Sequence, residues 1–119
     1  MPRLMACYMF GSAARNEASP SSDLDVAVLL PPGERIPDYL TLSALLSDAA
    51  GRQVDLVDLR QAGDFLRVEV LRDGRPLYVA DREQVLVWEG EAISEYGSHM
   101  ERIRPLLEDF KRTGVGYAG

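Results

Sequence analysis

The sequence predicts an α/β domain, and three observations support this class. Short apolar runs closed by glycine or proline have the length and boundaries of buried strands. Longer segments lie between these runs, and their apolar residues recur every three or four positions, as in helices. The chain has 119 residues, enough for one domain with a modest core. Strands that alternate with helices in a chain of this length are typical of an α/β domain.

The first two predicted strands flank a loop. Residues 4–10 form an apolar run that ends at Gly11, which predicts a buried strand. Residues 23–30 form a second run, which ends in the sequence Pro-Pro-Gly. Residues 16–22 are rich in Ser, Asn and Pro, and therefore predict a loop between the two strands.

The middle of the chain continues the alternation. Leucines at helical spacing predict a helix over residues 36–50, which Gly51 ends. Residues 54–59 predict a third strand, interrupted by acidic residues, and residues 61–72 predict a second helix. An Asp-Gly turn and a proline then lead into a fourth strand over residues 77–80.

The last third of the chain carries only a helical pattern. We expect Gly97 and Pro105 to break or kink this segment. The predicted organisation is one domain over residues 1–81, a helical segment over 82–112 that contacts a partner, and a flexible, glycine-rich tail over 113–119.

Composition limits the classes of function. The net charge of -6 argues against general nucleic-acid binding, which requires a basic surface. A single cysteine, Cys7, cannot form an intramolecular disulfide, which fits a reducing compartment. No apolar run approaches the length of a membrane span, and the first residues do not resemble a secretion signal. We therefore expect a cytoplasmic protein.

Two aspartates open the second predicted strand. Side chains alternate along a strand, so Asp23 and Asp25 share one face and lie about 6–7 Å apart. Two such carboxylates repel each other and are costly to bury without a cation. A pair of acids at a strand end is also common as a solvated surface feature, so the pair alone does not establish a site.

A third acid can complete a metal site. Asp55 lies in the third predicted strand, and three carboxylates converge if that strand neighbours the second. Such a cluster suits Mg²⁺, and two such ions can hold the attacking and leaving oxygens in nucleotidyl transfer. Asp58 competes with Asp55 for this place, but the two face opposite sides of an ideal strand. Asp55 is favoured because it is nearer the centre of the strand.

The Gly11-Ser12 pair supplies the second half of a candidate site. Gly11 lets the backbone approach a ligand closely, and Ser12 can begin a short helix whose N–H groups bind phosphate oxygens. Arg15 lies about one helical turn further on and can reach a phosphate or form a surface salt bridge. Anion donors upstream of metal-binding acids suit a nucleoside triphosphate with its magnesium.

These residues resemble a known family. The stretch FGSAARNEASPSSDLDVAVLL resembles the DNA polymerase beta-like nucleotidyltransferases, and specifically the minimal nucleotidyltransferases (MNT) that act as antitoxins beside HEPN toxins. The similarity is dense over residues 10–30 and looser through QVDLVDL and RPLYVA. Two features depart from the family pattern: Asn16 stands where glycine is usual, and no helix precedes the first strand.

The resemblance implies a fold and an activity. The fold is a small, half-open mixed sheet of about four strands, with helices on one face and a C-terminal helical extension. The implied activity is transfer of AMP from ATP to a tyrosine of a HEPN toxin, a ribonuclease, in a hetero-oligomer. Two magnesium ions are implied on Asp23, Asp25 and a third acid, with Asp55 also a general base. Gly11 and Ser12 are implied to hold the β- and γ-phosphates.

Two other functions fit the same residues. The chain can act as an antitoxin by binding alone, with the acids left unused. It can also be a small-molecule nucleotidyltransferase, although such enzymes usually carry an additional helical domain for their acceptor.

Overall fold

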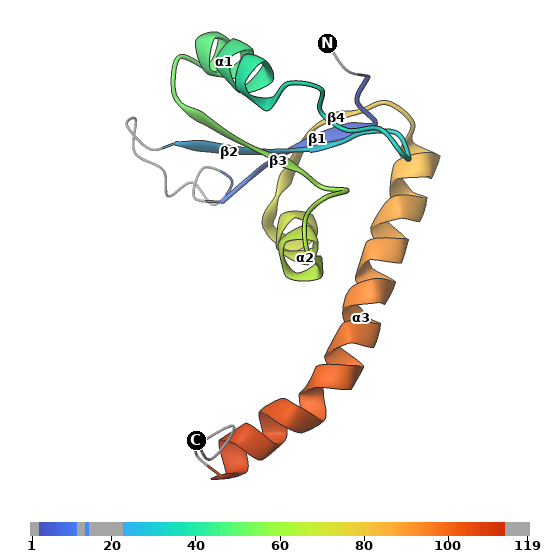
Figure 1. The fold of residues 1–119 in the computed structure, drawn as a ribbon. Helices are drawn as coiled ribbons and strands as arrows, with labels where there is room; N and C mark the ends of the chain where they lie inside the picture. Colours follow the sequence, from blue (N-terminus) through green and yellow to red (C-terminus); the bar gives the residue numbers. More distant parts are fainter. Residues whose placement is uncertain (1–2, 12–13, 15–22, 114–119) are drawn as a thin grey trace.

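The computed structural model of the chain describes residues 3–11, 14 and 23–113 (Figure 1). Its strands and helices start and end within a few residues of the ranges predicted from the sequence. In chain order they are β1 (Ala6–Phe10), β2 (Leu24–Leu29), α1 (Tyr39–Ala50), β3 (Val54–Asp58), α2 (Asp64–Asp73), β4 (Arg75–Val79) and α3 (Arg82–Thr113).

The strands form one mixed sheet in the order β3-β2-β1-β4. Strand β1 is antiparallel to both of its neighbours, whereas β2 and β3 are parallel. The predicted sheet of four mixed strands is therefore confirmed. The parallel pair is what brings the start of β2 and the start of β3 to the same edge of the sheet.

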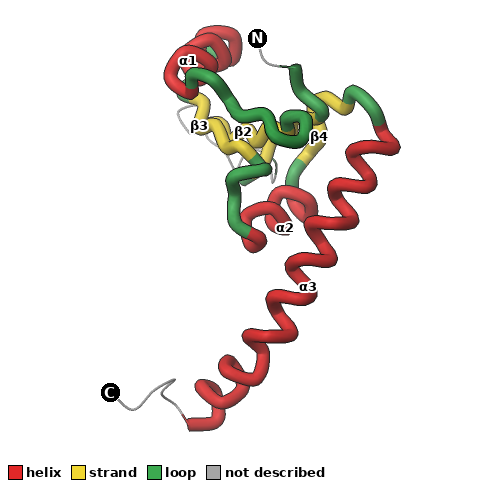
Figure 2. Tube along the Cα trace, turned by 45° about the vertical axis from the view of Figure 1, so that its right-hand side comes forward, coloured by secondary structure: helices red, strands yellow, loops and turns green. Residues whose placement is uncertain are grey.

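Helices cover both faces of this sheet, so the expectation of helices on one face is wrong. Ala27 and Leu29 of β2 pack with residues of α2 and α3. The alternate residues Val26 and Val28 pack with α1 on the opposite face. Figures 1 and 2 show α1 on one side of the sheet and α2 on the other. The physical reason lies in β2, which is apolar on both faces from Val26 onward and must be covered twice.

Local capping fixes the ends of α1. The Asp38 side chain accepts a hydrogen bond from the Thr41 backbone N–H at 3.1 Å, which satisfies a free donor of the first turn. Gly51 ends the helix with a left-handed backbone, φ +71°, as the sequence predicts. The chain then turns directly into β3, where the Val54 N–H donates to Ser47 Oγ at 2.9 Å.

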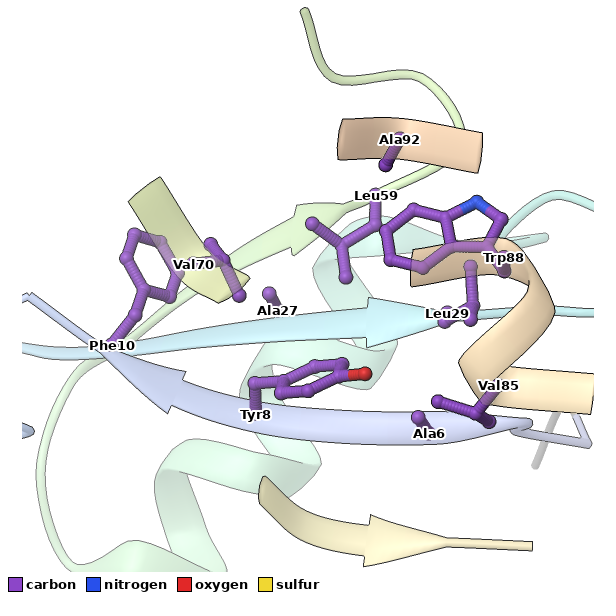
Figure 3. Packing of buried hydrophobic residues seen from close by; sticks show 10 residues of the cluster. All are labelled: Ala6, Tyr8, Phe10, Ala27, Leu29, Leu59, Val70, Val85, Trp88 and Ala92. Carbon is purple, nitrogen blue, oxygen red and sulfur yellow. The ribbon is translucent and has the colours of Figure 1, made fainter. Parts of the chain in front are cut away.

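Helix α3 is continuous over 32 residues, so neither Gly97 nor Pro105 breaks it. A glycine or proline inside a helix costs about 1 or 3 kcal/mol respectively, which a helix of this length can absorb. Its first half packs on the sheet through Val85, Trp88 and Ala92 (Figure 3). Its second half extends beyond the sheet and bends toward its C-terminal end (Figure 1). Within the described residues, no helix has both the length and the apolar composition to cross a membrane.

One partly buried hydrogen bond joins β1 to α3. The Tyr8 hydroxyl donates to Glu89 Oε2 at 2.9 Å. Burial, followed by this hydrogen bond and the charge of Glu89, raises the pKa of the Tyr8 phenol above its usual value. The folded state therefore retains a proton that the unfolded state loses at high pH.

This bond predicts a loss of stability in alkali. The unfolded phenol titrates near pH 10, so the free energy of unfolding should fall as the pH rises above about 10 and be unaffected below it. Replacing Tyr8 with Phe (Tyr8→Phe) should make that fall shallower, because the titrating group is gone. Urea denaturation at pH 8 and at pH 11 measures the difference, and an unchanged pH dependence in Tyr8→Phe would contradict the assignment.

Candidate active site

The register of β2 and β3 places two predicted site residues side by side. Asp25 is the parallel partner of Asp55. Paired residues of neighbouring strands point to the same face, and their strands lie about 4.8 Å apart. Asp25 is half-buried and Asp55 is exposed. Two carboxylates from strands far apart in sequence therefore lie on the face of the sheet that α2 and α3 cover.

On the other side of Asp25 lies the end of β1. Phe10 is the antiparallel partner of Asp25 and is buried, with Val70 of α2 in the same apolar cluster (Figure 3). Phe10 has no role in the site predicted from the sequence. The available signal was its position as the last apolar residue before the Gly-Ser pair. Phe10 therefore provides an apolar side chain on one side of Asp25, and Asp55 lies on the other side.

Gly11 follows Phe10 and turns the chain with a left-handed backbone, φ +72°. A Cβ atom at this position would collide with Asp25 Oδ2. The Asp25 carboxylate therefore lies directly against the α-carbon of Gly11, in space that any other residue would fill. The predicted phosphate-binding turn and the predicted metal-binding carboxylate are in contact.

The three predicted metal ligands are not gathered into one cluster. Asp23 is exposed and lies just before β2, two positions from Asp25. Across residues 3–11, 14 and 23–113, no group of three or more His, Cys, Asp and Glu side chains is close enough to hold a metal ion. Like-charged carboxylates repel one another, and a cation draws them together. The structure thus sets Asp25 beside Asp55, with Asp23 nearby on the strand.

Asp58 belongs to the opposite face. Its partner in β2 is Val28, which packs on the α1 side. The side chain is only 2% exposed, and its Oδ1 accepts a hydrogen bond from the Arg60 N–H at 3.0 Å, which forms the turn after β3. Burial, followed by the charge of Asp58, raises the pKa of the nearby Tyr39 phenol. Asp58 is therefore separated from Asp25 by the sheet itself.

The other predicted phosphate-binding residues, Ser12 and Arg15, lie outside the described residues, as does Asn16. Their roles stay predictions. Gly11 is the described part of the predicted phosphate-binding turn, and it contacts Asp25.

A family model covers this whole region. The model for polymerase beta nucleotidyltransferases matches residues 2–83, which contain all four strands, α1 and α2. The match ends at the start of α3. The arrangement of Gly11, Asp25 and Asp55 is therefore found within a nucleotidyltransferase domain.

Individual relatives extend the similarity into α3. The protein adenylyltransferase MntA of Shewanella oneidensis is 31% identical over 109 residues, which are 92% of this chain and 77% of that protein. A toxin–antitoxin crystal structure with AMP-PNP contains a chain that matches with a TM-score of 0.78 and 29% identity, over 93% of this chain and 89% of its own length.

A second similar structure contains an AMPylated toxin. It is a tri-AMPylated Shewanella oneidensis HEPN toxin in complex with an MNT antitoxin, and it matches with a TM-score of 0.72 and 27% identity over 93% of this chain and 86% of its own. Fold, site and relatives agree. This chain belongs to the polymerase beta nucleotidyltransferase family, and within it to the minimal nucleotidyltransferase antitoxins that include MntA.

Proposed function

We propose that this chain is an antitoxin that transfers AMP from ATP to a tyrosine of a cognate HEPN toxin. The observation that carries the proposal is the placement of Asp25 between Asp55 and the Gly11 turn. The two carboxylates can accept a proton or bind a cation, and the neighbouring turn at Gly11 is suited to binding phosphates. A cytoplasmic location is part of the proposal, because it fits the lone Cys7 and the use of ATP.

The acids also fit magnesium. Asp23, Asp25 and Asp55 offer carboxylate oxygens, which are the ligands that Mg²⁺ prefers, and Asp25 already lies beside the predicted phosphate turn. Magnesium bound there would neutralise phosphate charge and stabilise the attacking and leaving oxygens as the AMP group is transferred. We therefore also propose that AMP transfer depends on magnesium and uses two ions.

The chemistry assigns separate tasks to the residues. The toxin hydroxyl oxygen attacks the α-phosphorus of ATP, and the bond from that phosphorus to the bridging oxygen of the β-phosphate breaks. Pyrophosphate leaves with the bonding electrons. The hydroxyl proton passes to a base, for which we assign the exposed carboxylate of Asp55. Gly11 and Ser12 would hold the departing phosphates in place.

A mass measurement tests the proposal. The chain is incubated with its cognate toxin, ATP and Mg²⁺, and the intact mass of the toxin is recorded. We expect the toxin to gain the mass of one or more AMP groups and to lose ribonuclease activity. A toxin that is neutralised without any gain in mass would show that the chain acts by binding alone. A small acceptor without tyrosine, such as an aminoglycoside, should gain nothing.

The opposite orientations of Asp55 and Asp58 predict opposite results. Asp55→Asn should slow AMP transfer by about 100-fold or more, because the proposed base is lost. Asp58→Asn should leave the rate within a few-fold, because its side chain lies on the α1 face and asparagine keeps the Oδ1 acceptor. Initial rates of radiolabelled AMP incorporation measure both. The reverse order of effects would make Asp58 the third carboxylate.

We also propose that the second half of α3 contacts the toxin. The residues of α3 that pack on the sheet recur at three- and four-residue steps, and the same face continues beyond the sheet. Its continuation consists of Ile103, Leu106, Leu107 and Phe110, which we call the distal stripe. Leu106 is 70% exposed, and Leu107 and Phe110 are exposed too, so most of this stripe is uncovered within the described chain.

Charging the distal stripe should break the complex. The double change Leu106→Glu and Phe110→Glu should weaken toxin binding by about 100-fold or more, because two apolar anchors become charged at an interface. Leu40→Glu is the matched control, because Leu40 is 84% exposed on α1, on the other face of the sheet. Binding is measured by isothermal titration calorimetry. Equal affinity in all three proteins would place the toxin elsewhere.

A further inference from the structure

Gly11 and Asp25 are packed against each other more closely than any side chain at position 11 allows. The three atoms nearest to a Cβ built at Gly11 all belong to Asp25: Oδ2 in collision, Cγ at 3.1 Å and Cβ at 3.5 Å. We propose that Gly11 is a positioning residue for the Asp25 carboxylate, and that the absence of a side chain at Gly11 sets where this carboxylate lies. This role is separate from the binding of phosphate by the turn.

The backbone conformation of Gly11 does not account for this requirement by itself. Gly33 and Gly51 have the same left-handed backbone, with φ +80° and +71° against +72° at Gly11. A Cβ at either of them would meet no atom within 4 Å. A substitution at any of the three glycines would be strained by the left-handed backbone. Among these three, only Gly11 also lies against a carboxylate.

A Cβ at position 11 would meet the end of the Asp25 side chain, which is half-buried and must move to make room. Its neighbours across the sheet are Phe10 on one side and Asp55 on the other. A Cβ at position 11 would therefore displace the Asp25 carboxylate from its contact with Gly11, or would force the turn open. In either case the carboxylate leaves its place between the turn and the second acid. The turn and the carboxylate therefore behave as one unit.

A double-mutant cycle tests the contact directly. Gly11→Ala, Asp25→Ala and the combined variant are compared by urea denaturation, with Gly51→Ala as the control for left-handed strain. We expect Gly11→Ala to lower the midpoint clearly more than Gly51→Ala does. In the Asp25→Ala background, the two glycine substitutions should lower the midpoint by similar amounts, because the colliding carboxylate is gone.

Two results would overturn the proposal. One is an equal loss from Gly11→Ala and Gly51→Ala in the natural background. The other is a loss from Gly11→Ala that Asp25→Ala does not reduce. If Gly11→Ala does not fold, the combined variant should recover folding, and failure to recover it also contradicts the contact.

A second measurement tests the functional consequence, which rests on the proposed function. Binding of Mn²⁺ to the complete chain is followed by electron paramagnetic resonance without ATP. Gly11→Ala should weaken Mn²⁺ binding by about tenfold or more, since it displaces a proposed ligand, while Gly51→Ala should leave it unchanged. Equal Mn²⁺ affinity in Gly11→Ala and the natural chain would overturn the positioning role. If the natural chain binds no Mn²⁺, the metal proposal fails, while the denaturation cycle still decides whether Gly11 positions Asp25.

Discussion

Asp25→Asn should abolish AMP transfer to the toxin while leaving the toxin bound. The substitution keeps the shape of the side chain and removes its charge. Asp25 is the carboxylate that contacts the Gly11 turn and pairs with Asp55, so it belongs to both halves of the proposed site. We expect the rate to fall by about 10³-fold or more, because charge stabilisation around the α-phosphate of the transferred AMP group is the largest contribution in such reactions.

The control for this prediction is Asp48→Asn, which removes the same charge from an exposed position on α1. Its rate should match that of the natural chain. Toxin affinity, measured by calorimetry, should be the same in all three proteins. Asp25→Asn that still transfers AMP at the natural rate would remove Asp25 from the site. Asp25→Asn that transfers no AMP but still protects cells from the toxin would show that binding suffices for neutralisation.

Trp88→Ala should cause the largest loss of stability. Trp88 is 7% exposed and packs in the apolar cluster that joins α3 to the sheet, and Figure 3 shows its indole beside Leu59 and Leu29. Removing a buried tryptophan side chain leaves a cavity and costs about 3–5 kcal/mol. A small domain has a total stability of about 5–15 kcal/mol, so the variant should be partly unfolded at moderate temperature.

Circular dichroism with urea measures this loss, because Trp88 is the single tryptophan of the chain and its fluorescence disappears with it. The neighbouring Val87 is the control. It is 62% exposed, so Val87→Ala should change the free energy of unfolding by no more than about 0.5 kcal/mol. A loss below about 1 kcal/mol in Trp88→Ala would mean that α3 does not depend on this contact.

The elements of the fold could be predicted from the sequence because their signals are local. Glycines and prolines mark the ends of strands, and apolar spacing separates helices from strands. Predictions from the sequence were less accurate where the outcome depends on how many residues or several elements act together. The sequence predicted a break or kink at Gly97 and Pro105; α3 is unbroken, because the summed preference of its other residues outweighs two poor positions, but it does bend toward its C-terminal end.

The coverage of the sheet was a similar failure. The apolar residues of β2 and their alternation between two faces were visible in the sequence, but which helices cover each face follows from the tertiary packing. Both faces of β2 are apolar, so helices were needed on both sides. The pairing of β2 with β3 produced the site. That Asp25 lies beside Asp55 depends on a parallel register between strands that α1 connects.

The sequence by itself determined which residues can share a face. Side chains alternate with a period of two, so Asp23 and Asp25 must point the same way, and Asp55 and Asp58 must point opposite ways. Only the tertiary structure decided which strands are neighbours, which of the two acids faces Asp25, and that the Asp25 carboxylate lies against Gly11. Alternation is a property of the local backbone, whereas register and close packing arise when segments far apart in the chain bury their apolar residues together.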